Sequence, residues 1–277
     1  MAASAADRPL SSAFQTALGV LVTNTTIARR VLAGDLPLEA LDTTLTEPDQ
    51  ECLETLLGTQ RSRVLALAEL LTDRRKRKLV GRLPMTVAIL GGRLGECWTA
   101  YLESTVIQGT SVAPADAAAF GTWTLEHIEL SFSESQLIRH EQCQNEVAAG
   151  LPEFFQAAGA AADVTVVAEC RIRLTDNVRV EQFDQGIIAA LERFRTTGEV
   201  MCEQTGTRVD WVFHGLPERR GMVGITKVSR PVALLLIAAR SALEVREVLS
   251  ALPGERRRSL ERSLQKLVAL RILTVLE

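Results

Sequence analysis

The residues best suited to acid–base or metal chemistry gather in one stretch, His127 to Cys143, which reads HIELSFSESQLIRHEQC. It holds two of the three histidines, several glutamates and a cysteine, and a helix would put His140 and Cys143 on neighbouring turns. Such side chains are common Zn²⁺ ligands, but their spacing fits no zinc motif and a fourth ligand is missing. We expect no metal and no cofactor, and interpret these residues as polar groups on a helix surface.

Other catalytic motifs are missing from the sequence. No GxSxG nucleophile motif occurs, and the glycines of Gly91–Gly95 (GGRLG) follow no strand, so they predict a helix break rather than a phosphate loop. The cysteines are scattered singly, which is typical of reduced thiols, at Cys52, Cys97, Cys143, Cys170 and Cys202. We therefore expect a protein that is not an enzyme; an enzyme using the His127–Cys143 region is the third and weakest hypothesis.

The first of two basic clusters is a run of five cations near a helix end, formed by Arg74, Arg75, Lys76, Arg77 and Lys78. Cations at a helix C-terminus are favoured by the helix dipole, which allows an ordinary solvated helix end. The alternative is a docking patch for an acidic partner. Both interpretations stay open at the level of the sequence.

The second basic cluster lies between Arg240 and Glu277, a segment that contains eight Arg and Lys residues and five Glu residues. The helix predicted at Glu255–Arg271 could enter the major groove of DNA, or it could border a peptide that adds a strand to Val223–Val228. Gln265 is the only side-chain amide on this helix that could bond to a base edge, and the whole chain carries a net charge of −3. We therefore favour peptide binding over DNA binding. The candidate peptide-binding residues are Val223, Gly224, Ile225, Thr226, Lys227, Val228, Arg257, Arg258, Glu261, Arg262 and Gln265.

The elements that must position these residues fall into two modules. The 277-residue chain exceeds the usual size of one domain, and its few aromatic residues favour helices packed through Leu, Val and Ala. The net charge argues against nucleic acid as a partner. No secretion signal or membrane-spanning run is visible, which predicts a cytoplasmic protein with no membrane contact.

Residues 1–150 carry helical periodicity throughout and predict six or seven helices. Short β-type runs follow at 164–167, 171–174 and 178–182, and a helix is expected at 183–195. Two further runs at 209–214 and 223–228 predict a hairpin. The boundary between the modules is therefore expected within 150–162, and the fold class is α+β.

The last fifty residues predict three short helices and a terminal strand. Ser229 and Pro231 indicate a start for a helix that is apolar on all sides and should be buried. Ser241 and Glu244 form the pattern of a capping box for a second helix, closed by Pro253 and Gly254. With the third helix and the strand at 272–276, residues 163–277 are expected to form a winged-helix-like domain of three strands and three helices.

Two regions of the sequence carry a family resemblance. Asp73–Tyr101 (DRRKRKLVGRLPMTVAILGGRLGECWTAY) resembles the helical region of partner proteins of the multinuclear non-heme iron-dependent oxidative enzymes, through Lys76–Arg77, Leu83–Pro84, Thr86 and Gly91. The C-terminal part is similar in order to the recognition element of such partners, through TDNVRVEQFDQGI, VDWVFHG, VGITKVSRPVALLLIAARSALEVREVLSAL and LVALRIL. The segment 186–206 is an insertion relative to that pattern.

The resemblance implies a non-catalytic partner subunit that binds the leader of a ribosomally made precursor peptide. It would present the peptide to an iron-dependent TIM-barrel enzyme, with which it would form a heterodimer and to which the iron would belong. The runner-up is a winged-helix DNA-binding transcription regulator, motivated by Arg256–Arg258, Arg262 and Lys266.

Overall fold

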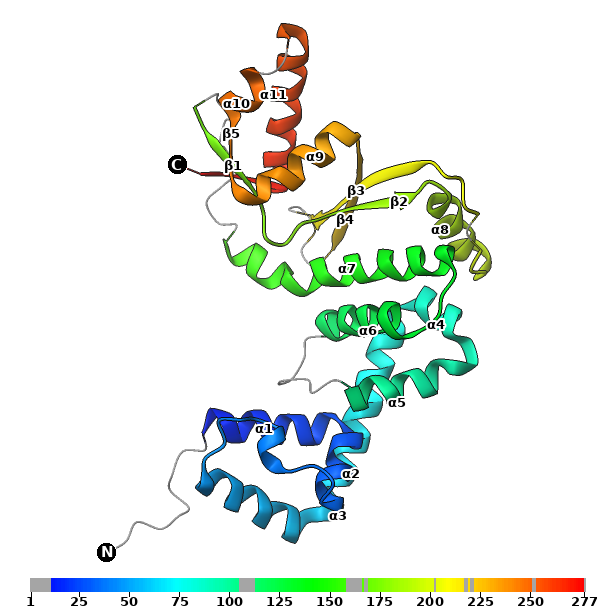
Figure 1. The fold of residues 1–277 in the computed structure, drawn as a ribbon, viewed down its shortest axis with the longest axis vertical. Helices are drawn as coiled ribbons and strands as arrows, with labels where there is room; N and C mark the ends of the chain where they lie inside the picture. Colours follow the sequence, from blue (N-terminus) through cyan, green and yellow to red (C-terminus); the bar gives the residue numbers. More distant parts are fainter. Residues whose placement is uncertain are drawn as a thin grey trace, which may run out of the picture. The chain divides into compact units, whose positions relative to one another are not determined.

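The computed structural model of the chain describes residues 11–104, 113–157, 166, 169–201, 203–216, 219, 222–250 and 253–276, with the side chains of 152–157 left aside. The fold is mixed α+β, with a large helical N-terminal part and small antiparallel sheets (Figure 1), which confirms the predicted fold class. In the part of the chain so described, none of the helices combines the length and the apolar character that crossing a membrane requires.

The chain divides into two compact units, Met1–Asp116 and Ala117–Glu277. This division falls earlier in the chain than the 150–162 boundary that composition suggested. The difference arises because α7 (Phe132–Ala157) packs on strands of the second unit.

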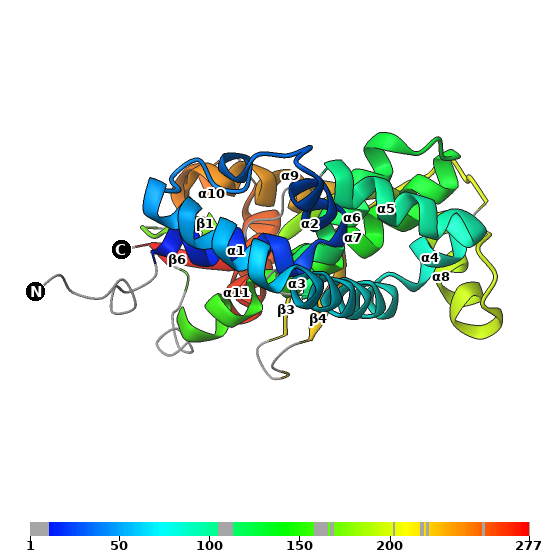
Figure 2. The same cartoon turned by 90° about the horizontal axis from the view of Figure 1, so that it is seen from below.

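The first unit is built from helices packed around α3. Its elements are α1 (Ser12–Thr23), α2 (Thr25–Ala33), η2 (Leu38–Ala40), α3 (Glu47–Arg82), α4 (Pro84–Leu90), η3 (Gly91–Arg93), α5 (Leu94–Ser104) and the start of α6 (Ala113–His127). Helices α1 and α2 pack on α3, and α1 lies beside it in Figure 2. Phe14, Val20 and Leu53 are among the fully enclosed apolar residues that form the core between them.

Local sequence sets the ends of these helices. The side chains of Ser11 and Asn24 accept hydrogen bonds from the main chains of Phe14 and Ile27, which caps α1 and α2. Thr46 and Asp49 form a reciprocal capping box at the start of α3. Gly91 adopts a positive φ of 53°, so the predicted helix break at GGRLG is confirmed.

The second unit contains the rest of α6, α7 and two three-stranded antiparallel sheets with their helices. The remaining elements are β1 (Arg171–Leu174), β2 (Arg179–Asp184), α8 (Gly186–Thr197), β3 (Arg208–Gly215), β4 (Val223–Val228), α9 (Arg230–Ala238), η5 (Ala239–Ser241), β5 (Leu243–Glu244), α10 (Val245–Ser250), α11 (Gly254–Ala269) and β6 (Leu273–Leu276). The strand orders are β5-β1-β6 and β2-β3-β4. Helices α7 and α9 pack against β2 and β3, and Figure 1 shows them on opposite faces of that sheet.

Strand pairing gives the expected hairpin and a partner for each other predicted strand that the structure describes. β3 and β4 pair antiparallel as predicted, and β2 joins them from the other side of β3. The expected strand at 171–174 is β1, which pairs with β5 and β6 in the other sheet. The expected run at 164–167 lies outside the described residues, except Val166. The helix expected at 183–195 is α8, at 186–197.

Two expectations for the C-terminal helices were wrong. The helix beginning after Ser229 is not buried on all sides, because Leu234 and Ile237 are 50% and 41% exposed. The capping box at Ser241 and Glu244 does not form: Ser241 ends a 3₁₀ turn and Glu244 lies in β5, so α10 begins at Val245. The pairing of β5 with β1 competes with helix formation there and prevails.

A tight loop joins α8 to β3 around the buried carboxylate of Asp184. This carboxylate accepts main-chain hydrogen bonds from Gly186, Thr205 and Gly206 and one from the Thr205 hydroxyl. These bonds, led by the main-chain ones, lower the pKa of Asp184 to about 2. Gly186 is required there, since a Cβ at this position would lie 1.8 Å from the Glu203 carbonyl oxygen.

We predict that Gly186→Ala destabilises the second unit by about 2 kcal/mol or more, because the new methyl group meets main chain that cannot rotate away. The free energy of unfolding in urea at pH 7 measures this. Gly254→Ala is the matched control, because Gly254 also begins a helix but faces open space. It should change the stability by less than about 0.5 kcal/mol. Equal effects of the two variants on stability would contradict the claim that the Glu203 main chain leaves no room for a side chain at Gly186.

Candidate functional site

β4 is an edge strand: among the described strands it pairs with β3 alone. The main-chain N–H of Leu216 donates to the carbonyl of Met222, which marks a hydrogen-bonded pair at the start of the ladder. Hydrogen-bonded and non-bonded pairs alternate along antiparallel strands. Gly224, Thr226 and Val228 therefore direct their main chain toward β3, and the residues between them direct theirs outward.

The outward main-chain groups belong to Val223, Ile225 and Lys227. Their side chains share the sheet face of Trp211 and Phe213, the residues opposite Lys227 and Ile225. This is the face that α7 covers. Ile225 is 38% exposed and Lys227 is exposed, so this edge presents a partly apolar row beside main-chain donors and acceptors that pair with no other described strand.

The other face of β4 is fixed in place. The Thr226 hydroxyl lies 3.0 Å from Nε2 of His214, whose Nδ1 lies 2.9 Å from the Gly215 carbonyl oxygen. Burial lowers the pKa of His214, consistent with a neutral ring that donates from Nδ1 and accepts at Nε2. Gly224 leaves no room for a side chain between His214 and Leu216. The edge is therefore held rigidly.

The predicted residues of α11 all lie on its exposed side. Arg258, Glu261 and Arg262 are exposed, and the Arg257 Nε donates to the Leu249 carbonyl at 3.2 Å. The Gln265 side chain accepts a hydrogen bond from the main chain of Val166 at 2.8 Å. The opposite side of the helix buries Leu264, Leu267 and Val268.

β4 and α11 border different sheets, although Val228 of β4 and the buried side of α11 contribute to one hydrophobic core. α11 packs on α10 and β6, next to the β5-β1-β6 sheet, whereas β4 belongs to the β2-β3-β4 sheet. The predicted residues therefore lie on β4, where Val223, Ile225 and Lys227 direct their main chain outward, and on the exposed side of α11. The exposed Leu234 and Ile237 of α9 were missed, because an all-apolar helix predicts burial and carries no sign of which side stays open.

The basic run near the end of α3 is split by one strong interaction. Arg75 makes two parallel hydrogen bonds of 2.9 Å to the carboxylate of Asp116, and its Nη1 donates to the Thr23 carbonyl at 2.6 Å. Tyr101 donates its hydroxyl to the same carboxylate at 3.0 Å. Burial, followed by the charge of Asp116, raises the pKa of Tyr101. Arg75 is thus committed to the fold and is not available for docking.

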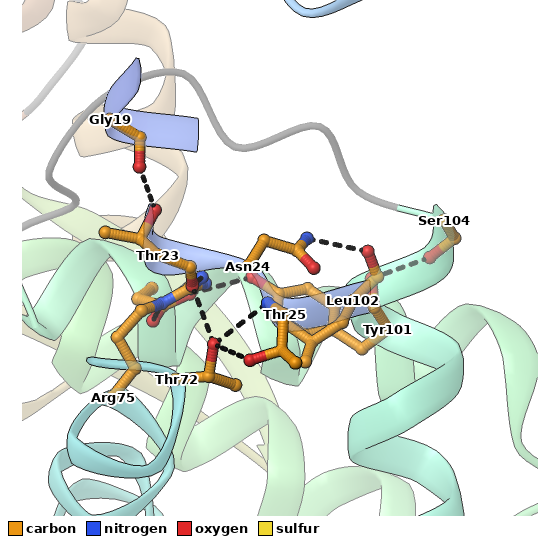
Figure 3. A network of polar contacts seen from close by, with 10 residues as sticks. Gly19, Thr23, Asn24, Thr25, Thr72, Arg75, Tyr101, Leu102 and Ser104 are labelled. Carbon is orange, nitrogen blue, oxygen red and sulfur yellow. Dashed lines mark hydrogen bonds and ion pairs between the residues drawn. The ribbon is translucent and has the colours of Figure 1, made fainter. Parts of the chain in front are cut away.

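Further polar contacts hold the junction of α1 and α2 on α3, as Figure 3 shows. The main chain and hydroxyl of Thr25 both bond to the hydroxyl of Thr72, at 3.0 and 2.9 Å. Asn24 donates its side-chain amide to the Leu102 carbonyl of α5 at 2.8 Å. These bonds connect the first two helices to α3 and α5, and an exposed ion pair of 2.8 Å also joins Arg29 of α2 to Glu69 of α3.

A cavity of about 230 Å³ opens beside the Arg75–Asp116 pair. Its lining joins three cations of the basic run to an apolar wall, and its residues are Thr23, Leu71, Arg74, Arg75, Lys78, Leu79, Ala113 and Asp116. Lys76 and Arg77 of the same run lie outside the lining. The five predicted docking residues therefore fall into a cavity-lining set and an outer set.

We predict that Asp116→Ala destabilises the first unit by about 3 kcal/mol or more, because it leaves the Arg75 guanidinium buried without its counter-charge. Chemical unfolding measures the loss, followed by tryptophan fluorescence, to which Trp98 contributes with its ring centroid 5.6 Å from the Arg75 guanidinium carbon. Asp116→Asn keeps the shape and some hydrogen bonds, so its loss should be smaller. Wild-type stability of Asp116→Ala would show that the pair is dispensable.

His140 is the least expected residue of the His127–Cys143 stretch. It lies on α7, is 3% exposed, and is surrounded by Phe183, Trp211 and Phe213 with ring centroids 5.4–6.0 Å away. Neither ring nitrogen has a hydrogen-bond partner among the described residues. Burial lowers its pKa to about 4, so the ring is neutral at pH 7.

The prediction that this stretch is a polar helix surface was wrong for several of its residues. His140, Glu141 and Cys143 are all buried. Burial raises the pKa of Cys143 to about 12, which leaves an unreactive thiol. In the part of the chain that the structure describes, no group of three or more His, Cys, Asp or Glu is arranged to hold a metal ion.

His140 should make the stability of the second unit depend on pH. The unfolded chain takes up a proton below about pH 6.5, whereas folded His140 does so only near pH 4, so the free energy of unfolding falls as the pH falls between these values. From pH 7 to pH 5 the wild type should lose about 2 kcal/mol more than His140→Leu. Unfolding curves at both pH values test this.

The exposed His127 provides the control, since His127→Gln removes a histidine without opening the aromatic cluster. It should retain the pH dependence of the wild type. An unchanged pH dependence in His140→Leu would show that His140 is not the group responsible.

Comparison with known protein-family models finds no match to this chain, and comparison with curated proteins finds no significant relative. The structural features described above are therefore the basis for assigning a function.

Proposed function

We propose that the protein is a non-catalytic partner subunit that binds the leader of a ribosomally made precursor peptide and presents it to an iron-dependent oxidative enzyme. One observation carries the peptide-binding part: the outer edge of β4 offers main-chain donors and acceptors at Val223, Ile225 and Lys227. A peptide added there as a fourth strand would pair these groups without altering the β3–β4 ladder.

The surroundings of β4 support strand addition. The strand is held rigidly by His214 and α7, so little order is lost when a peptide binds. Ile225 offers apolar contact to alternate side chains of an added strand. From β2 to β6 the described residues form five strands, four α-helices and one 3₁₀ turn, so α8 and β5 are additional to the three strands and three helices of the recognition element that the resemblance implies.

The resemblance supplies the remaining parts of the proposal. It assigns the iron and the oxidative chemistry to a TIM-barrel enzyme with which this chain forms a heterodimer in the cytoplasm. The test is calorimetry of the full chain with the precursor peptide encoded beside its gene, alone and together with the neighbouring iron enzyme. Binding in either mixture supports the proposal, and no binding in both contradicts it.

Ile225→Pro should weaken peptide binding at least about tenfold, because proline removes an outward N–H that the added strand needs. The β3–β4 ladder keeps its bonds, since the N–H of residue 225 points away from β3. Ile225→Thr retains this donor and is expected to bind within about threefold of the wild type. Circular dichroism confirms that each variant folds, and equal affinities of the two variants would rule out strand addition at β4.

A DNA-binding regulator is the second candidate, favoured by the row of exposed cations on α11. Arg258 and Arg262 lie one turn apart with Lys266 a further turn along, and all three are exposed. Such a row can follow the phosphates of a duplex. This function predicts tight, strongly salt-dependent duplex binding. Charge reversal at Arg257 and Arg262 that leaves duplex affinity unchanged would exclude it.

A further inference from the structure

The cavity beside α3 carries an excess of positive charge. Three of its lining residues are cations and one is an acid, and Asp116 is fully engaged: Arg75 bonds to both carboxylate oxygens and Tyr101 to one of them. Asp116 therefore cannot compensate Arg74 or Lys78. Neither of these two makes an ion pair with any described residue.

Apart from Thr23, the rest of the lining is apolar. Leu71, Leu79 and Ala113 form the wall beside the two uncompensated cations. A volume of about 230 Å³ holds a charged group of a few heavy atoms together with a short hydrocarbon stem. An anion that is polar on all sides, such as phosphate, would leave this wall uncovered and would meet no apolar contact of its own.

The apolar wall continues outward along the same helix. Leu67 and Leu70 are 43% and 59% exposed, and each lies four residues before a lining residue, Leu71 and Arg74 respectively. Residues at this spacing share one face of a helix. An exposed leucine pair thus leads directly to the charged cavity, an arrangement that a small free acid would not use.

We propose that this cavity binds the carboxylate of an acidic side chain on a partner polypeptide, whose apolar neighbours lie on Leu67 and Leu70. Arg74 and Lys78 hold the carboxylate, and the Arg75–Asp116 pair keeps the cavity in shape. The site is in the first unit and does not depend on β4, so it stands or falls separately from leader-peptide binding.

The first experiment tests the chemistry of the cavity with small anions. The full chain is titrated with butanoate or phosphate at constant ionic strength, and the backbone amide shifts of α3 are followed by NMR. Butanoate should saturate with a Kd on the order of 10 mM, tighter than phosphate. Phosphate binding as tightly as butanoate, or no saturation by butanoate, would overturn the carboxylate assignment.

Two double variants separate the cavity from the general charge of the helix. Arg74→Gln with Lys78→Gln should weaken butanoate binding at least about tenfold, because it removes both uncompensated cations. Lys76→Gln with Arg77→Gln makes the same change in charge on the same helix but outside the cavity, and should leave the Kd within about twofold. Equal weakening by both would indicate a diffuse electrostatic effect and overturn the site.

The second experiment tests the polypeptide source. A blocked heptapeptide with leucines at its first and fourth positions and glutamate at its seventh should bind at least about tenfold tighter than butanoate. Its glutamine counterpart should not bind detectably. Leu67→Ser with Leu70→Ser should remove the advantage of the peptide and leave butanoate binding unchanged. A peptide that binds no tighter than butanoate would overturn the partner polypeptide as the source.

Discussion

The pairing of Arg75 with Asp116 organises the first unit. The guanidinium uses three of its nitrogens at once, two on the carboxylate of α6 and one on the carbonyl that ends α1. Burying two charges is costly unless both are fully hydrogen-bonded, and here Tyr101 adds a further bond. Helices α1, α3, α5 and α6 therefore share one polar centre, which also determines which cations of the basic run remain open.

The second unit depends on packing between α7 and the aromatic face of β2-β3-β4. Phe183, Trp211 and Phe213 surround His140 there, and ion pairs to Arg139 and Arg179 border the contact. With one face of the sheet covered by α7 and the other by α9, the strand edges are what remains open. The candidate site therefore lies at the edge of β4 because α7 and α9 cover the two faces of its sheet.

Hydrophobic periodicity and the residues typical of helix ends and turns predicted much of the fold. The helices of the N-terminal part, the hairpin of β3 and β4, the break at Gly91 and the third C-terminal helix are all readable from short-range patterns. What failed depended on contacts between distant segments: β5 replaces a helix start at Ser241 by pairing with β1, and His140 is buried because α7 meets a sheet formed later in the chain. The candidate site divides in the same way, since β4 and α11 were each predicted, but the division of the strands into two sheets, with α11 packed on β6 of the other sheet, was not.

The open edge of β4 has a consequence for the protein in solution. A bare strand edge is a template for any chain with free main-chain groups, including another molecule of the same protein. Lys227 is the last of the three outward-facing residues and is exposed. If two such edges met antiparallel about Ile225, each Lys227 would lie opposite Val223 of the other molecule, and the cost of desolvating its charge would oppose self-association. One side chain can thus keep the strand unpaired while leaving it open to a segment that carries a complementary negative charge.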